Sequence, residues 1–135
     1  MEILERYSLP TSPLSALQPV CYAEDVIAMQ AEVKNIYCSR EVRSYVANLC
    51  AATRNHPALQ LGVSTRAAIA LIHAAQATAL LDGRDFILPD DVQQMAHAVL
   101  CHRMILSPEA RMKDQSTERV LSDILARVKL PVKLP

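Results

Sequence analysis

Arg66 is the side chain whose type and position in this sequence point most directly to chemistry. Ser64 is a plausible N-cap for the helix that follows, so Arg66 would lie in the first turn of that helix. A cation there faces the positive end of the helix dipole, at a cost of about 0.3–1 kcal/mol. An anion held at the same helix end would reverse this cost, because a guanidinium and free backbone N–H groups would both bind it. A solvated surface arginine is the alternative that the local sequence leaves open.

Catalysis by this chain alone is not indicated. A phosphate-binding loop needs two closely spaced glycines followed by lysine and a hydroxyl residue, and the chain has only Gly62 and Gly83. No serine or cysteine lies in a nucleophile signature. Two pairs of adjacent carboxylates fall in helix first turns, where negative charge suits the dipole: Glu24 with Asp25, and Asp90 with Asp91. Any nucleotide role of the chain must therefore be accessory to a core that lies elsewhere.

One pair of residues has the spacing of metal ligands. His97 and Cys101 stand four residues apart, which places them on one face of a helix, and His102 follows directly. Two ligands do not make a metal site, so we expect none. We interpret Cys101 as a packed thiol, and these two histidines and His73 as ordinary helix residues.

The composition indicates an all-α fold. Only 2 residues are glycine, 51% are hydrophobic and 4% are aromatic, a balance that favours helices over sheets. A chain of 135 residues can build one domain with a real core. We therefore expect a small bundle of four to five helices with extended tails.

The charge balance excludes two kinds of partner. Lys plus Arg equals Asp plus Glu at 14 each, so no net field attracts nucleic acid or an anionic membrane. No apolar run approaches the roughly 20 residues of a membrane span, and the start does not resemble a signal peptide, so we expect a cytoplasmic protein.

The four cysteines are unevenly spaced, and we expect reduced, mostly buried thiols: Cys21, Cys38, Cys50 and Cys101.

Hydrophobic periodicity places the helices that must position these side chains. The clearest amphipathic helix follows Ser39, and its apolar face repeats every three to four residues: Val42, Tyr45, Val46, Leu49, Cys50 and Thr53. Prolines interrupt the chain before residue 20 and after residue 55. Further helices are expected over Glu2–Tyr7, Ala23–Val33, residues 64–83, residues 89–103 and, after a cap at Ser116, residues 117–128.

Four segments resemble motifs of one protein family, and they occur in the family's order. Residues 60–70 (QLGVSTRAAIA) resemble the sensor 2 segment of MoxR-type AAA+ ATPases, in which G-x-S-x-R-A begins a lid helix. GRDFILPDDV and VLCHRMILSPEA are similar to the family's next two motifs, and CAATRNHP is similar to a stretch before them. The tail KLPVKLP resembles the family's V-P-V-P ending. The similarity extends over nearly the whole chain.

The resemblance implies a lid that assists an ATPase core absent from this chain. Arg66 matches the sensor 2 arginine, which contacts the γ-phosphate of ATP, and Gly62, Val63, Ser64 and Ala67 would shape that contact. ATP and Mg²⁺ would be bound by the core, and we expect none on this chain alone. The implied partners are the upstream core, a homo-oligomeric ring and a protein with a von Willebrand A domain that the machine matures or assembles.

The resemblance also implies a division of the chain. Residues 1–22 would be a short helix and linker from the core, 23–106 the helical lid domain, and 107–135 a loop, last helix and extended tail. Two positions depart from the family pattern: Thr65 replaces a common proline, and Leu88 replaces a capping threonine, which predicts a weaker cap at Pro89. The alternative function is a freestanding helical interaction module with no nucleotide role.

Overall fold

The computed structural model describes residues 17–131. The helix expected over Glu2–Tyr7 lies outside them, as does most of the KLPVKLP tail. The described residues divide into two units, with the boundary between Gln30 and Ala31. The first unit contains most of helix α2 (Ala23–Val33), which is the helix expected there and contributes no buried residue. The division into 1–22, 23–106 and 107–135 stays a prediction.

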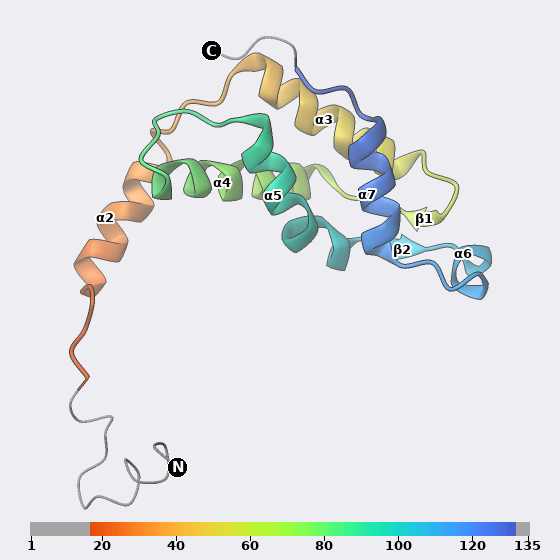
Figure 1. Cartoon of the computed structure of the whole chain (residues 1–135), viewed down its shortest axis with the longest axis horizontal. Coiled ribbons are helices and arrows are strands. Elements are labelled where there is room, and N and C mark those ends of the chain that lie inside the picture. Colours follow the sequence, from red (N-terminus) through yellow and green to blue (C-terminus); the bar gives the residue numbers. More distant parts are fainter. Residues whose placement is uncertain (1–16, 132–135) are drawn as a thin grey trace, which may run out of the picture. The chain divides into compact units, whose positions relative to one another are not determined.

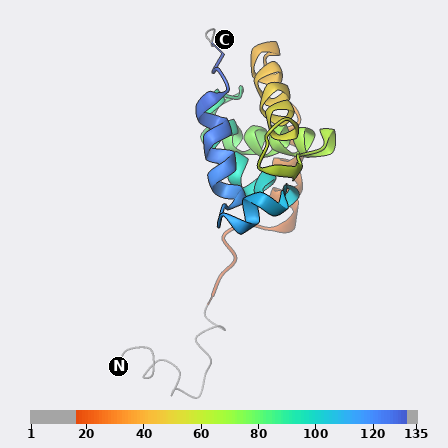
Figure 2. The same ribbon diagram turned by 90° about the vertical axis from the view of Figure 1, so that its right-hand side faces the viewer.

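The second unit is a helical bundle, which confirms the all-α prediction (Figure 1). Its helices are α3 (Arg40–Arg54), α4 (Thr65–Leu81), α5 (Pro89–Leu100), the 3-10 turn η2 (Cys101–Arg103), α6 (Pro108–Met112) and α7 (Thr117–Arg127). In Figure 2, α3 and α7 stand side by side and α4 crosses them. Within residues 17–131, no helix is long and apolar enough to cross a membrane.

Side-chain caps begin most of these helices. The Ser39 hydroxyl accepts a hydrogen bond from Val42 N at 3.2 Å, and Ser116 does the same for Arg119 N at 3.3 Å. The buried face of α3 consists of the six residues predicted from periodicity. The start of α3 at the Ser39 cap and the orientation of its apolar face are therefore as its sequence predicted.

The core is built largely from small and branched side chains. Ala67, Ala75 and Ala79 on α4 and Ala96 on α5 are all fully buried, and α4 packs against α5. Helix α7 adds Val120, Leu121 and Ile124 to the same core. One hydrophobic core therefore joins α3, α4, α5 and α7.

Three short elements were not predicted. Strands β1 (Leu59–Leu61) and β2 (Ile105–Leu106) form an antiparallel pair, in which Leu59 lies opposite Leu106. The segment from residue 107, expected only as a loop, contains the short helix α6 (Pro108–Met112). Its cap is Ser107, whose hydroxyl accepts from Ala110 N at 3.3 Å. Elements of two to five residues have too few positions to show a hydrophobic period.

Candidate functional site

The loop before α4 is fastened to the end of α3. Thr53 is fully buried, and its hydroxyl accepts a hydrogen bond from Val63 N at 3.0 Å while it donates to Cys50 O at 2.7 Å. The Nε of Arg54 donates to Val63 O at 3.0 Å. Both backbone polar groups of Val63 are thus bonded to neighbouring side chains of α3, and the Val63 side chain is buried. The position of the α4 N-terminus is therefore set by the last turn of α3.

Gly62 allows this loop to approach the α3 backbone. A Cβ at residue 62 would lie 2.6 Å from the backbone N of Arg54 and 2.6 Å from the carbonyl carbon of Thr53. These are backbone atoms that cannot move aside as the end of a flexible side chain could. Gly62 thus has a packing role that accounts for its residue type without a ligand.

The first turn of α4 presents Arg66 to solvent. The Ser64 hydroxyl accepts from Ala67 N at 3.4 Å, which is the N-cap predicted from sequence. Ala67 is fully buried and points into the core, whereas Arg66 is exposed. The first turn contains no acidic residue, and Arg66 has no hydrogen bond or ion pair with any residue between 17 and 131. The guanidinium is therefore available for an external anion.

An open depression of about 630 Å³ lies beside this helix end. Among the predicted site residues, Gly62, Val63 and Ser64 line the depression, while Arg66 and Ala67 do not. Its other lining residues are Gln60, Leu61 and Thr65, together with two arginines, Arg54 and Arg103. Sequence reasoning had assigned these arginines no role. Arg54 lies in the segment CAATRNHP and Arg103 in VLCHRMILSPEA, both of which resemble motifs of the family. The sequence does not indicate that the two arginines line the same depression, which only the structure shows.

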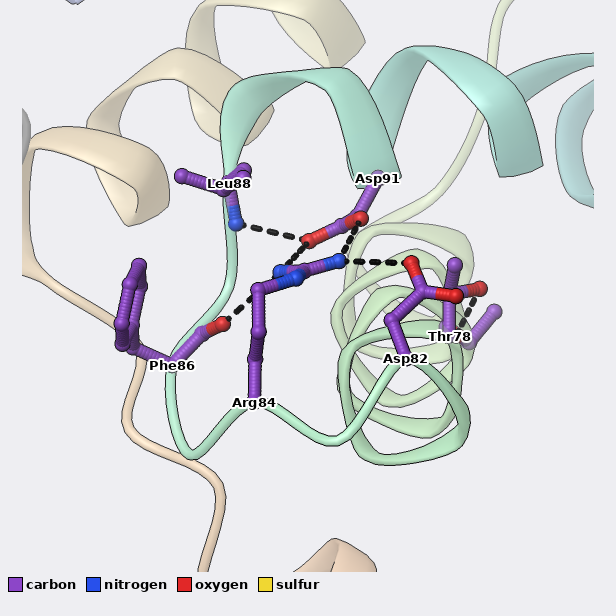
Figure 3. A network of polar contacts seen from close by, with 7 residues as sticks. Thr78, Asp82, Arg84, Phe86, Leu88 and Asp91 are labelled. Carbon is purple, nitrogen blue, oxygen red and sulfur yellow. Dashed lines mark hydrogen bonds and ion pairs between the residues drawn. The ribbon is translucent and has the colours of Figure 1, made fainter.

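Arg84 is an arginine of a different kind, because its charge is neutralised within the chain (Figure 3). Its Nη1 and Nη2 donate to the two carboxylate oxygens of Asp91 at 2.8 and 2.7 Å. Further bonds run to Asp82 at 2.9 Å and to the carbonyl of Phe86 at 3.1 Å. The hydrogen bond with Asp91, followed by that with Asp82, raises the pKa of Arg84. This network ties the end of α4 to the start of α5.

Asp91 also modifies the cap predicted for α5. Leu88 is the N-cap residue and has no side-chain oxygen, as the departure at this position indicated. Asp91 Oδ2 accepts from Leu88 N at 2.7 Å, so half of a capping box is present. The carboxylate of Asp91, predicted to stabilise the dipole of the helix first turn, is also buried and ion-paired with Arg84. The carboxylate is structural in both respects.

The cysteines and histidines form no metal cluster in residues 17–131. His97 Nδ1 lies 3.7 Å from Cys101 Sγ, and His97 Nε2 lies 3.5 Å from Ser122 Oγ. The prediction of mostly buried thiols is only partly right, because Cys50 is buried, Cys38 and Cys101 are half-buried, and Cys21 is exposed. Burial raises the pKa of the Cys38, Cys50 and Cys101 thiols, which disfavours their reactive thiolate forms.

Known proteins match both the sequence and the fold of this chain. Residues 51–124 match the AAA lid domain family. YeaC of Bacillus subtilis is 44% identical over 90% of this chain, and the Chaperone MoxR1 of Mycobacterium tuberculosis is 31% identical over 93% of it. The chain spans 38% and 35% of the lengths of these two relatives.

A solved structure has the same architecture. The crystal structure of a "putative ATPase" from Cytophaga hutchinsonii superimposes with a TM-score of 0.85 at 31% sequence identity, over 95% of this chain and 41% of that one. The family match, the sequence relatives and the solved structure agree on one assignment. The chain belongs to the AAA lid domain family, as the lid of a MoxR-type AAA+ ATPase.

Proposed function

We propose that this lid contributes to ATP binding and hydrolysis in a MoxR-type ATPase through Arg66, its sensor 2 arginine. The observation that carries the proposal is the placement of Arg66: an exposed guanidinium in the first turn of α4, with no acidic residue in that turn. A cation costs stability at this helix end unless an anion accompanies it. The γ-phosphate of ATP, held by the ATPase core, is the anion that the family assignment supplies.

The chemistry of Arg66 is electrostatic. A guanidinium beside the transferring phosphoryl group stabilises the charge that spreads over its oxygens, and it loses that contact when the phosphate leaves. The lid would then move relative to the core. Gly62, Val63 and Ser64 hold the helix end close to α3, and Ala67 keeps the next position free of a bulky side chain.

The remaining machinery belongs to the complete protein. ATP and Mg²⁺ are bound by the core, because this chain has no glycine-rich loop to surround phosphates. The complete protein acts in the cytoplasm as a homo-oligomeric ring and couples hydrolysis to chaperone-like maturation of partners, including proteins with von Willebrand A domains. The name of the mycobacterial relative, Chaperone MoxR1, supports the chaperone role.

The test is Arg66→Ala in the complete ATPase. Loss of a charge that acts in the transition state should reduce ATP turnover about 100-fold or more. The variant should keep the wild-type circular dichroism spectrum, since Arg66 is exposed. Arg127→Ala removes an exposed arginine from the last turn of α7 and should leave turnover unchanged. Full turnover by Arg66→Ala would remove Arg66 from the site.

A second test uses the 135-residue chain alone. The chain has no glycine-rich loop to surround phosphates, so ATP should bind with no better than millimolar affinity. Calorimetry measures this directly. Submillimolar affinity for ATP would show that the chain does not depend on a separate core for its nucleotide.

One feature favours the second candidate, a protein-interaction module. The outward face of α4 carries apolar side chains beyond Arg66, with Ile69 52% and Leu81 79% exposed. Amphipathic helices of globular domains normally turn polar residues outward, so this face suits a protein partner. If Arg66→Ala retains full turnover while Ile69→Glu abolishes function of the complete protein, the interaction module is the correct assignment.

A further inference from the structure

Arg54 and Arg103 meet at the depression beside α4 although they come from separate elements. Arg54 ends α3, and Arg103 ends η2, which leads into β2. No carboxylate lines this depression. Three other depressions within the described residues each include an acidic side chain: Glu41, Glu109, or Glu118 with Asp123. The depression beside α4 is thus a place where positive charge is gathered without an internal counter-charge.

Each of the two guanidinium groups is held by its Nε. Arg54 Nε donates to Val63 O at 3.0 Å, and Arg103 Nε donates to His102 Nε2 at 3.0 Å. The terminal nitrogens of neither group bond to any residue between 17 and 131. Arg84 provides the contrast, since both of its terminal nitrogens are occupied by acidic partners. Arg54 and Arg103 are therefore oriented but still able to bind.

We propose that Arg54 and Arg103 bind phosphate oxygens of the same nucleotide that Arg66 contacts, which makes the lid a three-arginine polyphosphate site. This inference rests on the proposed function and extends it from one residue to three. A planar guanidinium fixed at Nε presents its two terminal nitrogens as a fork that matches two phosphate oxygens. The N–H of Ala67 is bonded to the Ser64 hydroxyl and does not take part, and the charge at this site comes from the arginine side chains.

A polyphosphate fits this arrangement better than a single carboxylate. Two cations that share a depression repel each other, and one monovalent anion leaves a net positive charge between them. A triphosphate carries several negative charges and enough oxygens for more than one arginine. The volume of about 630 Å³ falls within the roughly 300–1,000 Å³ of small-molecule sites.

The direct test is titration of the 135-residue chain with inorganic tripolyphosphate, observed by NMR. We expect millimolar affinity, with shifts at the Arg54 and Arg103 Nε–H signals and at the amides of Gly62 and Thr65. Arg103→Ala should weaken binding about tenfold, and Arg103→Lys should not restore it, because a lysine has no fork. Arg127→Ala, which removes an equal charge from another surface, should leave the affinity unchanged.

Steady-state kinetics of two variants of the complete ATPase distinguish this inference from the proposed function. Arg103→Ala should raise KM for ATP about tenfold or more, whereas Arg66→Ala should act mainly on kcat. Loss of turnover in Arg66→Ala with wild-type kinetics in Arg103→Ala would overturn the three-arginine site and leave sensor 2 in place. Wild-type turnover in Arg66→Ala would overturn the proposed function itself. Tripolyphosphate shifts confined to other surfaces would also overturn the inference.

Discussion

The hydroxyl of Thr53 accepts a hydrogen bond from Val63 N at 3.0 Å, and through this bond the last turn of α3 holds the residue before the Ser64 cap. Arg54, the next residue along α3, donates from Nε to the carbonyl oxygen of the same residue, Val63, at 3.0 Å. Two neighbouring side chains therefore define where α4 begins. The position of Arg66 depends on this anchor, since it lies three residues beyond Val63.

Thr53→Val tests the anchor with a side chain of nearly the same shape. The substitution leaves Val63 N buried without an acceptor, so the free energy of unfolding should fall by about 1–3 kcal/mol. Urea denaturation of the 135-residue chain measures the loss. Thr53→Ser keeps the hydroxyl and should retain most of the stability. Equal stability of the valine and serine variants would show that the hydrogen bond contributes nothing.

Gly62→Ala should destabilise the fold through a backbone clash. The added Cβ would lie 2.6 Å from Arg54 N, so we expect a loss of about 1–3 kcal/mol and displaced amide signals for Val63 and Ser64. Gly83→Ala is the matched control: its φ is +72°, and a Cβ there meets no atom within 4 Å. That variant should lose about 1 kcal/mol from backbone strain alone and leave the loop before α4 unchanged. A smaller loss in the Gly62 variant would contradict the close approach.

Asp91→Asn should break the buried half of the Arg84 network. Asp91 is 3% exposed and accepts from Arg84 and Leu88, whereas asparagine keeps one acceptor oxygen and loses the charge that pairs with Arg84. We expect the free energy of unfolding to fall by roughly 3 kcal/mol. Asp82→Asn removes the other partner of Arg84, whose side chain is 59% exposed, and should cost less than about 1 kcal/mol. Thermal unfolding of both variants checks this order, and equal losses would contradict it.

Alkylation should distinguish the four cysteines. Cys21 is exposed and should react first with iodoacetamide at neutral pH. Burial raises the pKa of Cys38 and Cys101, so their thiolates should form at higher pH and react more slowly. Cys50 is 1% exposed and should react last, after unfolding. Mass spectrometry of digested samples over time gives the order, and early labelling of Cys50 would contradict the packing of α3.

Periodicity and capping residues were sufficient to predict the main helices. The six apolar positions of α3 and the caps at Ser39, Ser64 and Ser116 were identified from sequence, because these features depend on residues within a few positions of one another. The exposed first-turn location of Arg66 follows from the same local rules. The fold class and the candidate arginine were therefore accessible without a structure.

Contacts between separate elements were not accessible in this way. Arg54 and Arg103 lie on different elements, and no local pattern indicates that both line one depression. The hydrogen bond between Val63 N and the Thr53 hydroxyl closes a loop that contains a proline and the strand β1. Hydrophobic periodicity does not predict the path of such a loop. In the sequence, Asp91 looks like any acidic residue in the first turn of a helix, and its ion pair with Arg84 is visible only in the structure. Tertiary packing decided all three cases.

Helix α4 is fixed at both ends: at its start by the bonds to Val63, and at its end by the Arg84–Asp91 pair. Its 17 residues give a rod about 25 Å long. A tilt of about 5° at one end displaces the other by about 2 Å. Under the proposed function, loss of a phosphate contact at Arg66 would tilt α4 as a rigid rod, and the Arg84–Asp91 pair would carry the resulting displacement to α5.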